Sequence, residues 1–219
     1  MKKLLIAAFV ILGLSAANAQ VTFKPGIRAG ANFSHFTQGE QYFYDDVYYD
    51  EYNQMQYYNA RPADFTSKAD FYVGVYGALH LTKYYTLQPE INYTRQGSNI
   101  EFLNQNNILV KTKLNVSYIS VAVINKFTFS DKLNIHVGPT IDVVVDQPRN
   151  FYANNYSRYN DVDAEIDLAF VLGLGYNFTK NLGIEARVKK GIIPVLDFSN
   201  SNHTNVVFSA GLTYTFDVK

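Results

Sequence analysis

An alternation of side-chain character with a period of two is the feature that most constrains this fold. In residues 172–191, LGLGYNFTKNLGIEARVKKG, alternate positions are apolar and the positions between them hold glycine, asparagine or charged residues. Because successive side chains of a β-strand point to opposite faces of the sheet, this stretch predicts two strands joined by Thr179, Lys180 and Asn181. Similar alternation predicts strands at about 22–34, 69–82, 84–96, 113–128, 132–146, 164–178, 182–193 and 204–217.

The connections between these predicted strands alternate between short and long. Short polar turns follow the second, fourth and sixth strands, whereas long loops are expected at about 35–68, 97–112, 147–163 and 194–203. In an up-and-down barrel, this order places the short turns and both termini at one end and the long loops at the other. The sequence therefore predicts an all-β fold over residues 20–219, an eight-stranded antiparallel up-and-down transmembrane β-barrel.

Glycines on the polar face of the strands indicate which face points inward. Gly26 and Gly30 share a face with Arg28, and Gly183 shares one with Glu185. Glycine weakens a strand that faces water, whereas the interior of a small barrel needs small residues beside long ones. We therefore expect the polar face to line the lumen and the apolar face to contact lipid. The alternative is a soluble barrel or sandwich with the apolar face as its core, which leaves the glycines unexplained.

Aromatic residues favour the membrane interpretation. The chain has 18 Tyr and 16 Phe, and rings with a polar tip favour the boundary between lipid and water. Near the short turns and the C-terminus we expect an aromatic girdle of Tyr84, Tyr85, Phe127, Phe129, Phe178, Tyr214 and Phe216.

The first 19 residues predict a cleaved secretory signal peptide. Lys2 and Lys3 precede an apolar run that ends near Leu14, and small residues lead to a cleavage site after Ala19. The alternative, a membrane anchor, needs roughly 20 apolar residues, and this run is shorter. The chain has no Cys, so no disulfide or thiolate metal site is expected, and its 19 basic and 19 acidic residues give no electrostatic case for nucleic-acid binding.

Six segments, in this order, carry a family resemblance: GIRAGANFS, LQPEINYTRQGS, YISVAVINKF, HVGPTIDVVV, LGLGYNFTKNLGIEARVKKG and GLTYTF. Over residues 22–217 the chain resembles the small outer-membrane β-barrel family of Bacteroidota, the PorT-like proteins. The resemblance implies a Gram-negative outer-membrane barrel, with outer-membrane lipid as its surroundings, but little chemistry, although some members are linked to secretion. Ser120 and Ala122 stand where the family's common Tyr-Leu-Glu-Ile-Pro motif has Glu and Pro, which puts a role of that carboxylate in doubt. Phe216 near the C-terminus is a displaced form of the aromatic that marks substrates of the barrel-assembly machinery.

Four charged residues share the predicted inward face at similar distances from the short turns: Arg28, Glu90, Glu185 and Arg187. Because buried charges are tolerated only when they are paired, we expect an internal ion-pair network that plugs the lumen. Lys126, Lys189 and Asp142 are expected at its periphery. The alternative is a path that conducts protons or solutes.

The loop at 35–68 is the candidate contact surface. Residues 40–58 hold five carboxylates and seven tyrosines without a basic residue, and Tyr48, Tyr49, Asp50 and Glu51 are expected near its tip. Tyrosine-rich loops suit recognition, so a protein or glycan partner is one interpretation. A cation site and a solvated loop without a ligand are the alternatives.

The sequence shows no convergent catalytic set. His35 and His203 both fall at the loop-side rim, near Asp197, Ser199 and Ser201, but strand parity places the two histidines on opposite faces. Gly173-Leu174-Gly175 lies within a strand and is not a nucleotide-binding loop. We therefore expect no catalytic residue, cofactor or metal. The predicted function is a non-enzymatic outer-membrane barrel with contact loops, and the alternatives are a lipid- or peptide-modifying enzyme or a narrow solute channel.

Overall fold

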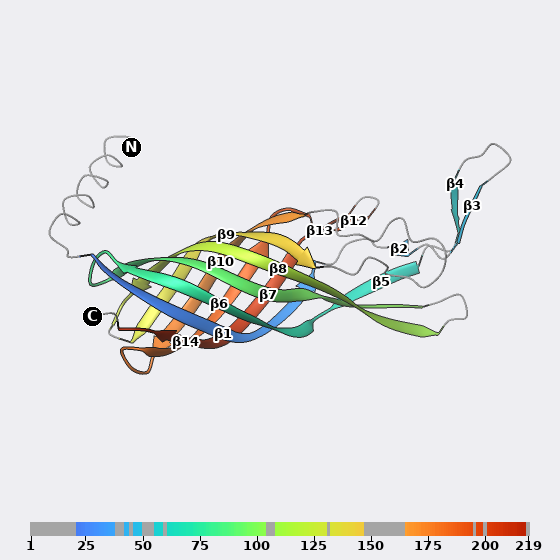
Figure 1. Cartoon of the computed structure of the whole chain (residues 1–219). Coiled ribbons are helices and arrows are strands. Elements are labelled where there is room, and N and C mark those ends of the chain that lie inside the picture. Colours follow the sequence, from blue (N-terminus) through green and yellow to red (C-terminus); the bar gives the residue numbers. More distant parts are fainter. Residues whose placement is uncertain are drawn as a thin grey trace, which may run out of the picture.

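Eight long strands form a closed antiparallel barrel (Figure 1). The computed structural model describes residues 21–37, 42–43, 46–49, 55–58, 61–103, 108–130, 132–146, 165–194, 196–198 and 201–217, so the predicted signal peptide lies outside them. The barrel strands are β1 (Thr22–Phe36), β6 (Lys68–His80), β7 (Tyr85–Leu103), β8 (Leu109–Thr128), β9 (Leu133–Asp146), β10 (Ile166–Asn177), β11 (Leu182–Gly191) and β14 (Asn205–Thr215). Pairing of β1 with β14 closes the sheet, which confirms the predicted fold class.

A shared hydrogen-bond pattern closes the three short turns at one end of the barrel, where β1 begins and β14 ends (Figure 1). In each turn, a Ser or Thr hydroxyl accepts a hydrogen bond from the backbone N–H three residues later. This local bond offers the chain a turn instead of a continued strand. The bonds run from Tyr85 to Thr82 at 3.0 Å, from Leu133 to Ser130 at 3.1 Å and from Leu182 to Thr179 at 2.9 Å.

The burial of the strands confirms the predicted orientation of their faces. Leu172 and Leu174 point outward and are 58% and 57% exposed, whereas Glu185 and Arg187 point inward and are 2% and 5% exposed. Gly173 lies opposite Arg187 in the register of β10 and β11. A Cβ atom at Gly173 would lie 2.6 Å from Cγ of Arg187, so this glycine makes room for a long side chain inside the barrel.

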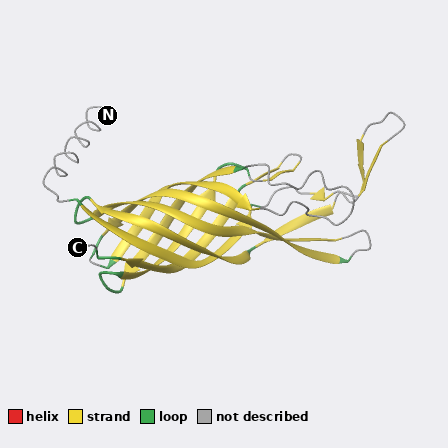
Figure 2. Ribbon diagram, in the orientation of Figure 1, coloured by secondary structure: helices red, strands yellow, loops and turns green. Residues whose placement is uncertain are grey.

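Strands also extend beyond the barrel at its loop side (Figure 2). Strands β7 and β8 pair from Tyr85–Phe127 to Leu103–Leu109, so most of the predicted loop at 97–112 is a hairpin extension. Shorter strands follow at β2 (Tyr42–Phe43), β3 (Asp46–Tyr49), β4 (Met55–Tyr58), β5 (Arg61–Thr66), β12 (Leu196–Phe198) and β13 (Ser201–His203). Strand β5 pairs with the outer part of β7, where Thr66 lies opposite Asn99. The predicted loop at 147–163 lies outside the described residues.

Apolar side chains gather at the loop-side end of the barrel. Phe36, Phe65, Ile100, Leu114 and Val116 are each 3% exposed or less, and the rings of Phe36 and Phe65 meet edge to face at 5.6 Å. Three of them fall in segments that the sequence predicts as loops, so the strand pattern did not reveal this cluster. Within the described part of the chain, no helix has the length and apolar character needed to cross a membrane.

Candidate functional site in the barrel lumen

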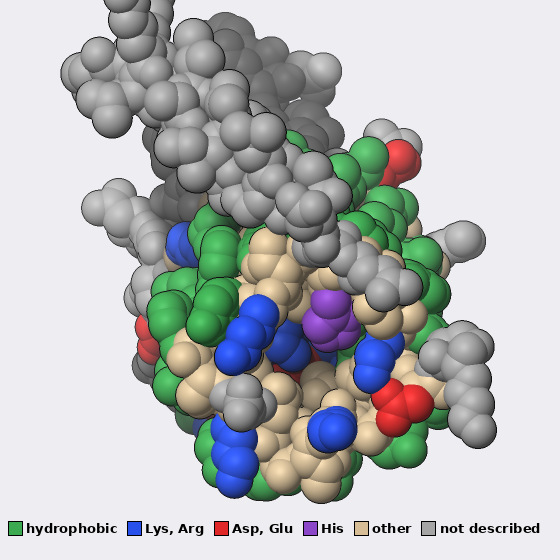
Figure 3. Space-filling view, turned by 90° about the vertical axis from the view of Figure 1, so that its left-hand side faces the viewer, with side chains coloured by type: hydrophobic (Ala, Val, Ile, Leu, Met, Phe, Trp, Pro, Cys, Tyr) green, Lys and Arg blue, Asp and Glu red, His purple; other side chains and the backbone are tan. Residues whose placement is uncertain are grey.

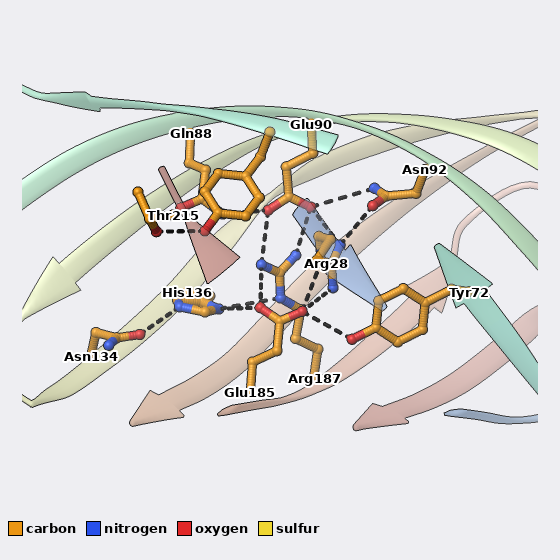
Figure 4. Close-up of polar contacts among 11 residues, drawn as sticks. Arg28, Tyr72, Gln88, Glu90, Asn92, Asn134, His136, Glu185, Arg187 and Thr215 are labelled. Carbon is orange, nitrogen blue, oxygen red and sulfur yellow. Dashed lines mark hydrogen bonds and ion pairs between the residues drawn. The ribbon is translucent and has the colours of Figure 1, made fainter. Parts of the chain in front are cut away.

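The structure brings together the four predicted lumen charges in one ion-pair network (Figure 4). Nη1 of Arg28 lies 2.6 Å from Oε2 of Glu90, and Nε of Arg28 donates to Oε1 of Glu185 at 2.8 Å. Nη1 and Nη2 of Arg187 donate to the two oxygens of Glu90 at 2.9 and 2.8 Å. Nη2 of Arg187 also lies 2.9 Å from Oε2 of Glu185. Each charge therefore contacts both opposite charges.

Polar side chains from neighbouring strands surround this network. Gln88 donates to Glu90 at 2.8 Å, and Tyr72 donates its hydroxyl to Glu185 at 3.1 Å. The guanidinium carbon of Arg28 lies 4.6 Å from the centre of the Tyr72 ring, and its Nη1 donates to Oδ1 of Asn92 at 3.1 Å. None of these three partners is among the predicted site residues, although Tyr72 falls on the inward face that strand alternation predicts.

His136 joins the network as a neutral imidazole. Its Nδ1 accepts a hydrogen bond from Nε of Arg187 at 3.2 Å, and its Nε2 lies 2.6 Å from Oδ1 of Asn134. Because Nδ1 is an acceptor, the proton is carried on Nε2, which donates to Asn134. Nδ1 of His136 also lies 3.8 Å from Oε2 of Glu185, but the contact with Arg187 is shorter and sets the tautomer. A charge on this imidazole would face the Arg187 guanidinium at close range.

The three predicted peripheral charges lie outside this network. Lys189 pairs with Asp142, and the Thr140 hydroxyl donates to Oδ1 of Asp142 at 3.2 Å. Lys126 lies opposite His136 in the register of β8 and β9, and the described ion pairs do not include it. Arg28, Glu90 and Lys189 all line a cavity of about 50 Å³, which is room for a few water molecules.

Figure 3 looks into the end of the barrel that holds the short turns. Lysine or arginine side chains and one histidine surround a hollow there. Lysines near these turns are Lys24, Lys83, Lys126, Lys132 and Lys180, and Lys24 pairs with Asp217 at 2.6 Å. This mouth of the barrel is therefore predominantly basic.

The candidate contact residues of the first long loop are described in part. Tyr48 and Tyr49 belong to β3, where they lie opposite Gln56 and Met55 of β4. Asp50 and Glu51 lie outside the described residues. The structure thus places the two tyrosines at the end of a short hairpin.

The two histidines at the loop-side rim, His35 and His203, have different neighbours. His203 is fully buried beside Phe65, at 5.5 Å between ring centres, and its Nδ1 lies 2.8 Å from the carbonyl oxygen of Thr37. His35 lies opposite Val206 in the pairing of β1 with β14. Over the described residues, no group of three or more His, Cys, Asp or Glu side chains is arranged to hold a metal ion.

Comparisons with known proteins concern the whole barrel. The chain matches the profile of a family described as outer membrane protein beta-barrel domain over residues 18–197. A search of curated proteins found no match.

Several solved structures are similar to the chain. OprG from Pseudomonas aeruginosa has 14% identity and a TM-score of 0.46, with 90% of this chain and 98% of OprG covered. Ail from Yersinia pestis, solved with the heparin analogue sucrose octasulfate, has 14% identity and a TM-score of 0.45, with 89% and 99% covered. Neisserial surface protein A has 13% identity and a TM-score of 0.46, with 88% and 97% covered.

Proposed function

Because the chain belongs to the outer membrane protein beta-barrel domain family and resides in the outer membrane, we propose that it is a non-enzymatic barrel with an occluded lumen whose surface loops, chiefly 35–68, contact a partner or the cell envelope. The inference that the lumen is occluded rests on one observation, which is that the ion-pair network joins strands on different sides of the barrel. Arg28 of β1 contacts Glu90 of β7 and Glu185 of β11, so the paired side chains cross the lumen.

The network supports a plug better than a conducting path. Four residues, Arg28, Glu90, Glu185 and Arg187, form ion pairs with one another and are 2% to 6% exposed, so an ion that enters must break buried pairs. The test is conductance of the purified protein in planar lipid bilayers. We expect no steady open channel from the wild type, and large steady conductance would favour the channel alternative.

The enzyme alternative requires a nucleophile, a base and an orienting group that converge near the rim. The buried carboxylates Glu90 and Glu185 are engaged by arginines, which favours a structural role for them. Incubation of the purified barrel with phospholipid, lipopolysaccharide and peptide substrates tests this alternative. Turnover that survives mutation of the contact loop would support an enzyme.

The first long loop is the proposed contact surface because its base is fixed to the barrel. Strand β5 pairs with β7, and Phe43 of β2 lies opposite Arg61 of β5. The hairpin of β3 and β4 projects beyond this base and carries Tyr48 and Tyr49 (Figure 1). A rigid scaffold that presents a tyrosine-rich loop suits a protein or glycan partner.

Deletion of residues 46–58 tests the contact role. It leaves Phe43 and Arg61 paired and joins them through a short hairpin loop, so the barrel is expected to assemble normally. We expect the deletion to abolish binding in a glycan array and in cross-linking on intact cells. Replacement of Tyr48 and Tyr49 by Ser is the matched variant that keeps the loop length. Binding that is unchanged in both variants would reject the loop as the contact surface.

We also propose a more specific family, a cleavage site and a partner in biogenesis. We assign the chain to the PorT-like proteins of Bacteroidota, with a signal peptide at 1–19 and the barrel-assembly machinery as its partner during biogenesis. The family match begins at residue 18, next to the predicted cleavage site. N-terminal sequencing of the protein from outer membranes tests the cleavage, and we expect the mature chain to begin at Gln20.

A further inference from the structure

An exposed lysine lies in each of the three short turns at the end of the barrel where β1 begins. These lysines are Lys83, Lys132 and Lys180. Their ammonium groups form no ion pair with another described residue and donate no hydrogen bond to one. A lysine ammonium has three donors, so these groups can still bind an anion outside the chain.

Two of the turn lysines lie against exposed aromatic rings. Nζ of Lys132 lies 6.0 Å from the centre of the Tyr176 ring, and Nζ of Lys83 lies 5.6 Å from the centre of the Tyr84 ring. Tyr176 is 40% exposed on the outward face that it shares with Leu174, and Tyr84 is 60% exposed within its turn. Both charges therefore lie beside rings at the edge of the lipid-facing surface.

The combination of a lysine with an exposed ring recurs in all three turns. The pairs are Lys83 with Tyr84, Lys132 with Phe129, and Lys180 with Phe178, and the rings are 60%, 64% and 50% exposed in that order. Phe129 and Phe178 continue the outward alternation of β8 and β10. Aromatic belts lie where hydrocarbon meets the headgroups, so a lysine beside such a ring holds its ammonium group at the level of the phosphates.

Carboxylates do not cancel the positive charge of these turns. Asp217 pairs with Lys24 at 2.6 Å and accepts a hydrogen bond from Asn181 at 3.0 Å, and Lys180 acts on it from a greater distance than that of an ion pair. The sequence places one acidic residue within the three turns, Asp131, which lies outside the described residues. The turns therefore carry an excess of positive charge, in agreement with the basic side chains around the hollow in Figure 3.

We propose that this rim binds anionic phospholipid, with Lys83, Lys132 and Lys180 on the headgroup phosphates and the neighbouring rings against the upper acyl chains. The partner is a lipid because the lysines lie beside exposed rings at the edge of the lipid-facing surface. The turns join β6 to β7, β8 to β9 and β10 to β11, so their lysines suit a plane of headgroups better than one small anion. A lysine near an anionic membrane surface strengthens binding by about fivefold.

Native mass spectrometry of the purified barrel in non-ionic detergent tests the proposal. The protein is titrated with phosphatidylglycerol and, separately, with phosphatidylcholine that has the same acyl chains. We expect three sites on the wild type that bind phosphatidylglycerol about fivefold more tightly than phosphatidylcholine. The double variant Lys83→Gln with Lys132→Gln should keep one such site, because Lys180 remains.

A control variant removes the same charge from the loop-side end. Lys111→Gln with Lys113→Gln changes two exposed lysines of the β7 and β8 extension, and it should keep all three sites. Replacement of the three turn lysines by arginine keeps the charge and should keep the preference. Free glycerol phosphate should not displace phosphatidylglycerol, because it has no acyl chains to contact the rings.

Thermal unfolding in detergent is the second readout. Added phosphatidylglycerol should raise the unfolding midpoint of the wild type more than phosphatidylcholine does, and high salt should reduce the difference. Equal binding of the two lipids by the wild type would overturn the proposal, and so would a double turn variant that keeps three sites. An equal loss in the loop-side control would show a general effect of net charge, and displacement by glycerol phosphate would show a site for a soluble anion; either result would also reject the lipid rim.

Discussion

Removal of the Glu90 carboxylate is the sharpest test of the lumen network. Glu90 accepts hydrogen bonds from Arg28, Arg187, Gln88 and Asn92 and is 2% exposed. Glu90→Ala leaves both guanidinium groups buried with half of their compensating charge. Removing one partner of a buried ion pair costs about 3–5 kcal/mol, so we expect Glu90→Ala to lower the free energy of unfolding by about that amount.

A double-mutant cycle separates the charge from the packing. Glu90→Gln keeps the shape of the side chain but leaves the network with one excess positive charge, because Glu185 alone then faces both arginines. Arg187→Gln leaves one excess negative charge, because Arg28 alone then faces both glutamates. In the double variant the two amides can hydrogen-bond to each other without a stranded charge between them. We expect the double variant to lose less free energy of unfolding than the two single variants lose in sum, with a difference of about 0.5–3 kcal/mol.

Urea unfolding in lipid vesicles, followed by circular dichroism, measures these free energies. The matched control is Glu101→Gln, since Glu101 pairs with Lys111 at 2.8 Å outside the barrel, where the two side chains are 27% and 63% exposed. Exposed pairs contribute about 0–1 kcal/mol. If Glu90→Ala and Glu101→Gln lower stability equally, the network does not stabilise the barrel and the reasoning fails.

Further substitutions test the outward face, the inward glycines and the turns. Val75 is 54% exposed on the outward face, so Val75→Arg should cost about 2–4 kcal/mol if it lies near the membrane midplane, measured by unfolding in vesicles; a neutral effect would contradict lipid contact. Gly173→Ala should displace Arg187 and cost about 1–3 kcal/mol in the same assay, and unchanged stability would show that the lumen has spare room. Thr179→Ala removes the hydroxyl that accepts from Leu182 and should cost about 0.5–1.5 kcal/mol, whereas Thr179→Ser should restore the wild-type value.

The alternation in the sequence predicts most of the fold because the geometry of a strand is set by near neighbours in the chain. Side chains alternate with every residue, so the inward position of Arg28 and the outward position of Leu172 follow from parity alone. The loop-side extension was harder to predict. Gly97 adopts a φ of 132° within β7, and the strand continues past it to Leu103, whereas the sequence pattern ended the strand at 96.

The alternation of strand positions does not specify how far along the barrel axis an inward side chain lies. Lys126 and Lys189 have the same inward parity as Arg187, yet Arg187 meets Glu90 while Lys189 meets Asp142. The stagger of the paired strands decides which inward residues reach the same level, and that stagger depends on contacts between segments far apart in the chain.

The sequence by itself determined the strand order, the inward and outward faces and the all-β barrel, because alternation and turn chemistry act between near neighbours in the chain. Only the tertiary structure decided that His136 accepts a hydrogen bond from Arg187 and that Gly191 makes room for the carboxylate of Asp167. These contacts join residues of different strands, and their partners are set by closure of the sheet and the shared level of the side chains inside it.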